Sequence, residues 1–218
     1  MLRNFTRLPA LATLGLASVL LAGCAKDGDI DATGGISVTR SACPAVAIPA
    51  HTGDITVFDP AEARDASAID VVAAITNLRE DCTQQGADIV ATAKFDVRAT
   101  RRQSAGARQV DLPYFATVVQ GGRVVVSKRL GTIRLNFADG QTRAEASGSA
   151  TGYVNRAAAT LPPEIEQRLT RKRKAGDADA AVDPLANPDV RAAVQKASFE
   201  LLIGFQLSDA QLQYNATR

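Results

Sequence analysis

Apolar and polar residues alternate through the middle of the chain. Between residues 87 and 100 the apolar side chains occupy every second position, at Ile89, Ala91, Ala93, Phe95, Val97 and Ala99. Most positions between them hold polar or charged side chains. A period of two places successive side chains on opposite faces of an extended strand, so this segment is predicted to be a half-buried antiparallel strand.

Four further segments are predicted to be strands: residues 110–120, 123–130, 132–137 and 198–207, of which the last two alternate most clearly. Residues 143–154 alternate small apolar with polar residues and predict a weaker strand. Gly121-Gly122 lies between two β-branched runs and predicts a two-residue hairpin, because a primed turn needs positive φ at its centre. Gly131 predicts a break before residue 132, and Asp139-Gly140 predicts the next turn.

Residues 69–80 fit two kinds of element. Ser67 followed three residues later by Asp70 is typical of a helix start, yet the apolar residues from position 69 to position 75 also alternate. We favour a strand, because the segment leads into Cys82 between strand-like neighbours.

The pattern changes after Thr160. Leu161-Pro162-Pro163 begins a stretch in which two apolar residues lie four apart, which predicts a short helix because Pro suits a first turn. Residues 176–182, rich in Ala and Asp, are predicted to be an exposed loop. Asn187-Pro188 predicts the start of a second helix, to about residue 196, and Ser208-Asp209 predicts the cap of a final one.

About seven or eight strands with short turns predict a mainly β fold. We expect a two-sheet antiparallel sandwich, immunoglobulin or fibronectin III-like, with short C-terminal helices; a small barrel is the alternative. Residues 43–218 are expected to form this single domain, with a helical segment at about 161–197, because the mature chain is long enough for one sizeable core and too short for two.

The first 24 residues have the composition of a secretory signal. Arg3 and Arg7 precede an apolar stretch from residue 8 to residue 21, which ends in Leu21-Ala22-Gly23-Cys24. This tetrapeptide resembles the lipobox of bacterial lipoproteins, and the resemblance implies that residues 1–23 are removed and that Cys24 is acylated. An ordinary signal peptide with a coincidental Cys is the alternative. Ala25 follows the Cys where an Asp would resemble an inner-membrane retention signal, so we expect an anchor on the periplasmic face of the outer membrane.

Residues 24–42 are predicted to be a flexible tether. Their Gly, Asp, Thr and Ser content cannot bury enough apolar surface to order the segment. Asp27, Asp29 and Asp31 alternate as in a calcium loop, but Ala32 occupies the position that requires Gly. A solvated linker is therefore the better interpretation.

Net charge excludes one class of function. Removal of Arg3 and Arg7 leaves 25 − 2 = 23 basic residues against 23 acidic ones. A nearly neutral protein lacks the broad basic surface of a nucleic-acid binder, so we expect no nucleic-acid partner.

Cys43 and Cys82 remain once Cys24 carries lipid. In an oxidising compartment such a pair predicts a disulfide. Two buried free thiols or a metal pair are the alternatives. The chain has a single His, His51, and two thiolates with one imidazole at irregular spacing form no recognisable zinc pattern.

Motifs for catalysis are weak, and we expect neither an enzyme nor a bound cofactor. The chain has no Gly-x-Ser-x-Gly elbow and no phosphate-binding glycine loop. Glu62, Asp65 and Asp70 lie close together in the sequence, but solvated turn residues with Arg64 and Arg79 as partners are the simpler interpretation.

One run concentrates positive charge: Arg168, Arg171, Lys172, Arg173 and Lys174. Such a run can contact an anionic surface, for example lipid headgroups or an acidic partner. The simpler alternative is a solvated helix end whose positive charges complement the helix C-terminus.

Segments of the body resemble a group of Gram-negative envelope lipoproteins without known chemistry. They are Cys43-Pro44, residues 64–70, Leu112-Pro113-Tyr114-Phe115 and residues 204–215. We therefore expect a membrane-anchored, non-catalytic interaction or scaffold module with an envelope protein partner. A periplasmic carrier of a small ligand or lipid, and a hydrolase with unrecognised carboxylates, are the alternatives.

Overall fold

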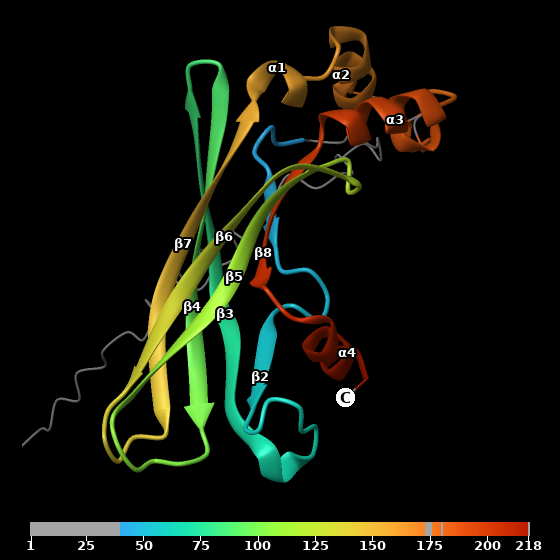
Figure 1. The fold of residues 1–218 in the computed structure, drawn as a ribbon. Helices are drawn as coiled ribbons and strands as arrows, with labels where there is room; N and C mark the ends of the chain where they lie inside the picture. The colour runs from blue at the N-terminus through green and yellow to red at the C-terminus, as the bar shows by residue number, and fades with distance from the viewer. Residues whose placement is uncertain (1–39, 173–175, 180, 218) are drawn as a thin grey trace, which may run out of the picture.

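The computed structural model describes residues 40–172, 176–179 and 181–217 (Figure 1). In this part of the chain eight strands form two four-stranded sheets packed face to face. The strands are β1 (Ala45–Ala47), β2 (Asp54–Phe58), β3 (Ile69–Gln85), β4 (Asp88–Arg101), β5 (Arg108–Gln120), β6 (Val124–Phe137), β7 (Arg143–Asn155) and β8 (Phe199–Phe205). The mainly β two-sheet sandwich is therefore confirmed.

The strand order defines sheet I as β1-β8-β5-β6 and sheet II as β2-β3-β4-β7. Every pair is antiparallel except β1 with β8, which run parallel. An immunoglobulin constant domain has the orders ABED and CFG. This protein therefore shares the two-sheet architecture of that class but has a different strand order.

The space between the sheets is filled by side chains that face inward at every second position. Phe95 from β4, Phe137 from β6 and Phe205 from β8 are each at most 1% exposed. Smaller residues surround them on both sheets, including Ala91 and Ala93, which are fully buried. The period-two pattern therefore predicted the buried face correctly.

The ambiguous segment at residues 69–80 is a strand, part of the 17-residue β3. Its pairing with β4 shifts between Thr76 and Arg79, and Asn77 in this bulge has a φ of 54°. The buried carboxylate of Asp96 on β4 accepts hydrogen bonds from Asn77 Nδ2 and from Ser147 Oγ on β7. These hydrogen bonds lower the pKa of Asp96 from its ordinary value, with a smaller contribution from nearby Arg79.

The predicted break at Gly131 is wrong, because β6 continues through it to Phe137. Gly131 pairs with Tyr114 on β5. A Cβ on Gly131 would lie 2.4 Å from Tyr114 Cζ and 2.6 Å from its hydroxyl oxygen. The glycine is there because the tyrosine ring lies over its backbone, a packing reason that a local signal cannot show.

The predicted hairpin at Gly121-Gly122 is confirmed, with φ of 59° and 70° at the two glycines. The turn closes through the Arg123 N–H, which donates to the Gln120 carbonyl at 3.2 Å. Gln120 and Val124 are the first paired residues, so the loop holds three residues where the sequence predicted two.

The described residues contain four helices, which follow or flank β7 and β8: α1 (Arg156–Ala159), α2 (Pro163–Thr170), α3 (Pro188–Ala197) and α4 (Asp209–Thr217). The last three match the predicted helices. α1 was not predicted, although the Asn155 side chain caps it by accepting from the Ala157 N–H. Short 3-10 turns lie at Ala66–Ala68 and Pro184–Ala186.

The helices occupy two places in Figure 1. α1, α2 and α3 lie at one end of the sandwich, called here the helical end, where Ile165, Leu169 and Val190 belong to a second small core. α4 lies beside β2. The Asn215 side chain donates to the carbonyls of His51 and Asp54 at 2.9 and 2.8 Å, so α4 covers this edge of sheet II.

The contact at Gly131 generates a stability prediction. Gly131→Ala is expected to lower the free energy of unfolding by about 1–3 kcal/mol, because the added methyl group overlaps the Tyr114 ring. In a Tyr114→Leu background the same substitution should cost less, since the overlap is removed. Urea denaturation of the four proteins of this cycle measures the coupling, and equal costs in both backgrounds would contradict this explanation.

The hydrogen bonds of Asp96 generate a pH prediction. The unfolded chain takes up a proton at a higher pH than native Asp96, so this contribution to stability is present above the unfolded pKa and is lost as pH falls below about 4. Asp96→Asn should therefore make the fall of the melting temperature below about pH 4 shallower. Asp88→Asn, at the exposed start of the same strand, is the matched control. An equally steep fall in Asp96→Asn and the original protein would refute the assignment.

Candidate functional site at the helical end

Arg40, the first described residue, is bound to the helical end by its side chain. Its Nη1 donates to the carbonyl of Ala159 at the end of α1 at 2.9 Å, and its Nη2 donates to the carbonyl of Ala197 at the end of α3. Helix C-termini carry partial negative charge, so a guanidinium suits this place. Burial lowers the pKa of Arg40 from its ordinary value, and arginine nevertheless stays protonated in proteins.

Arg40 was missed by the sequence analysis, which assigned residues 24–42 to the tether. The structure moves this boundary, because Arg40 contacts two helices and Ala42 packs against the main core. The partners of Arg40 lie 119 and 157 residues away in the sequence. No local signal could have indicated them.

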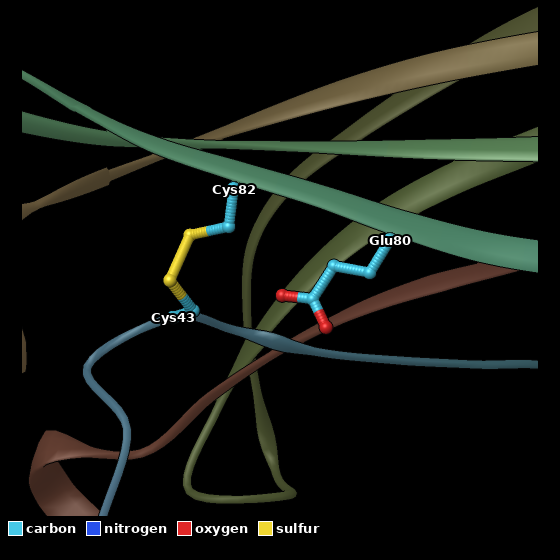
Figure 2. A group of neighbouring side chains, drawn as sticks. All are labelled: Cys43, Glu80 and Cys82. Atoms are coloured by element: carbon cyan, nitrogen blue, oxygen red, sulfur yellow. A yellow bond between two sulfur atoms is a disulfide. The ribbon is translucent and has the colours of Figure 1, made fainter.

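Next along the chain, Cys43 and Cys82 form the predicted disulfide (Figure 2). Their Cα atoms are 6.2 Å apart. Cys43 precedes β1 at the edge of sheet I, and Cys82 lies on β3 of sheet II. The bridge therefore ties the two sheets together close to the point where the chain enters the body.

Glu80 extends toward the disulfide from β3 in Figure 2. Among the described residues, Cys43, Glu80 and Cys82 bring their potential metal ligands within 4.8 Å of one another. The two sulfurs are bonded to each other and so offer no thiolate to a metal. His51 lies apart from this group, in an exposed turn with a φ of 64°. The alternative of a metal pair thus finds no support here.

Three residues of the predicted basic run lie at the end of α2. Arg168 is in its last turn, Arg171 is its C-cap residue and Lys172 follows, all exposed. Arg171 Nη2 lies 3.0 Å from Asp179 Oδ1, in an ion pair that the sequence did not indicate. Arg173 and Lys174 lie outside the described residues.

The acidic residues considered as catalytic candidates have structural partners. Asp65 caps a 3-10 turn, and its hydrogen bond with the Ser67 hydroxyl lowers its pKa. Asp70 forms a two-point ion pair with Arg108 on β5, at 2.7 and 2.6 Å. For Asp70 the predicted partners, Arg64 and Arg79, were wrong: β5 supplies Arg108, which is 38 residues away in the sequence. Glu62 is exposed.

An open hollow lies on the outer face of sheet II. It is lined by Val72, Ala74 and Thr100, beside Arg98 and Glu145, which form an ion pair at 3.3 Å. Their neighbours along the strands, such as Ala73 and Ala99, face the buried core. The hollow is thus outside the sandwich, whereas a carrier of apolar ligands needs a cavity between its sheets.

No protein-family model, curated protein or solved structure matches the chain. Within the described residues, no helix is long and apolar enough to cross a membrane.

The disulfide generates a third prediction. Replacing both cysteines, as Cys43→Ala with Cys82→Ala, should lower the free energy of unfolding by about 4 kcal/mol, because the unfolded chain is no longer constrained by a loop spanning 39 residues. The reduced original protein should behave like the double variant. Denaturation of both proteins with and without reductant is the measurement, and a double variant as stable as the oxidised protein would contradict the role given to the bridge.

Proposed function

We propose that this chain is a lipid-anchored envelope lipoprotein. Its sandwich would act as a non-catalytic interaction module on the periplasmic face of the outer membrane. The observation that carries the proposal is the tetrapeptide Leu21-Ala22-Gly23-Cys24 behind a charged and apolar start. A disulfide in the body supports it, since such bonds persist in oxidising compartments.

The position of Arg40 supports one orientation of the anchored body. Arg40 follows Cys24 by 40 − 24 = 16 residues. A chain of that length spans at most about 55 Å. Because Arg40 is fixed to α1 and α3, the helical end is where the anchor would be attached. Arg168, Arg171 and Lys172 lie at this end, where they could contact anionic headgroups or an acidic envelope protein.

The filled core favours an interaction module over the two alternatives. A carrier would need space between the sheets, where Phe95, Phe137 and Phe205 are packed instead. A hydrolase would need carboxylates that converge on a cleft, whereas Asp65 and Asp70 are engaged in a helix cap and an ion pair.

Replacement of the acylated residue tests the anchor. The mass of the native protein should exceed the mass of the polypeptide that begins at Cys24. The difference should be that of a diacylglyceryl group and one further acyl chain. The protein should also sediment with membranes. Cys24→Ser should lose the added mass, because serine has no thiol to carry the diacylglyceryl group, and should lose the membrane attachment that the acyl chains provide.

Two substitutions of Ala25 serve as control and as a test of location. Ala25→Ser should keep both the acyl mass and the outer-membrane location. Ala25→Asp should keep the acyl mass but move the protein to the inner membrane. A native protein without acyl mass would refute the lipid anchor.

A further inference from the structure

An unusual apolar surface lies at the start of β6. Four of the seven large apolar side chains that are exposed in the described residues occur here, and they define the valine patch: Val124, Val125, Val126 and Leu130. Their exposed fractions run from 51% to 68%. Exposed apolar residues gathered in one place indicate a contact with something other than water.

A β-bulge interrupts the pairing of the valines, and the start of β6 is exposed on both of its faces: every residue from 124 to 130 is exposed. Val118 on β5 pairs with Ser127, but the next residue, Val119, pairs with Val125, so that Val126 is left without a partner. The alternation of buried and exposed residues begins only at Ile133, so neither face of the strand before it is covered by the sandwich. β6 is also the edge strand of sheet I in the described part of the chain.

The same bulge argues against a strand as the occupant. Natural sheets protect their edges from further strands with bulges and with lysines, and this edge has both. Arg123, Lys128 and Arg129 are exposed around the valine patch. A second copy of the chain is disfavoured too, because paired edges would bring these cations together.

The charge around the valine patch selects an anionic occupant. No Asp or Glu occurs between residues 121 and 137. The nearest acidic residue by strand register is Glu200, which lies on β8 beyond β5. Lys128 lies over the Phe115 ring at 5.3 Å and Arg129 over the Tyr153 ring at 5.7 Å, and both side chains remain exposed.

The hairpin tip and the start of the described chain are attached to the same turn. The Gly121 N–H donates to the Ser198 carbonyl at 2.9 Å, and Gln120 Nε2 donates to the Lys196 carbonyl at 2.7 Å. Arg40 donates to the carbonyl of Ala197, the residue between them. The tip of the β5–β6 hairpin accordingly lies at the helical end in Figure 1, beside α3.

We propose that the valine patch inserts into the interface of a membrane that contains anionic phospholipid. Arg123, Lys128 and Arg129 would contact the lipid phosphates, while the valines displace water from the boundary with the acyl chains. Apolar residues flanked by cations are the combination that such an interface binds. The proposal rests on the proposed lipid anchor, which would hold this hairpin near the membrane.

The absence of Trp from the sequence allows a direct experiment. Val125→Trp places a single fluorophore in the valine patch, and Leu212→Trp places one on exposed α4 as the matched control. Each full-length acylated protein is reconstituted on vesicles of phosphatidylethanolamine and phosphatidylglycerol. Val125→Trp should shift its emission to the blue, become quenched by brominated acyl chains and resist aqueous acrylamide. Leu212→Trp should remain open to acrylamide.

A charge-reversal arm tests the role of the cations. In the Val125→Trp background, Lys128→Glu or Arg129→Glu should reduce the ratio of inserted to free hairpins by about fivefold or more, because each cation near an anionic surface contributes about that factor. Arg102→Glu, in the exposed loop after β4, should leave the ratio unchanged. Circular dichroism checks the fold, and Val124→Trp replaces Val125→Trp if that variant unfolds.

Flotation of the vesicles separates the two proposals. If Val125→Trp floats with the vesicles but is quenched by acrylamide as readily as Leu212→Trp, the hairpin proposal is overturned and the anchor stands. If the native protein lacks acyl mass, the proposed lipid anchor is refuted. The proposed insertion of the hairpin is then tested on the unanchored chain, by whether vesicles shift the emission of Val125→Trp to the blue. A blue shift that requires an envelope protein extract, and is absent on protein-free vesicles, would assign the patch to a protein partner and overturn the proposal.

Discussion

The packing of sheet I against sheet II is the interaction on which the rest of the structure depends. Phe95, Phe137 and Phe205 are buried between the sheets, and full burial of such a side chain contributes about 1.5–3 kcal/mol. With the interior filled, chemistry and recognition are left to the surface. α4 covers the edge at β2, and the disulfide joins the sheets near β1, whereas the bulged start of β6 stays exposed.

The sequence predicted those parts of the fold that a periodic pattern can encode. Inward-facing residues recur at every second position, so the face of β4 was evident from residues 87–100 alone. β1 and β2 have only three and five residues, too few to establish a period. The pairing of β1 with β8 joins segments about 150 residues apart, as the register of Val46 with Leu201 shows. The break predicted at Gly131 was wrong because the glycine makes room for the Tyr114 ring on another strand, and the local sequence does not show this contact.

The candidate site was predictable to a similar degree. The cysteine pair followed from compartment and count, because after Cys24 only Cys43 and Cys82 remain. The contacts of Arg40 depend on the arrangement of three distant segments and left no pattern in the sequence. The three valines can be read in the sequence, but their exposure depends on the position of β6 at the edge of sheet I, where both faces of the strand are uncovered, and only the structure reveals this.

These features give the helical end a consistent role. The lipid-bearing tether that we propose would meet the body at Arg40, and the hairpin tip is attached to the same turn. Hydrogen–deuterium exchange tests this orientation most directly, by comparing the acylated protein on anionic vesicles with the Cys24→Ser chain in solution. Exchange should slow at residues 121–130 and stay unchanged in α4. Equal exchange of residues 121–130 in the two samples would contradict a membrane-facing helical end.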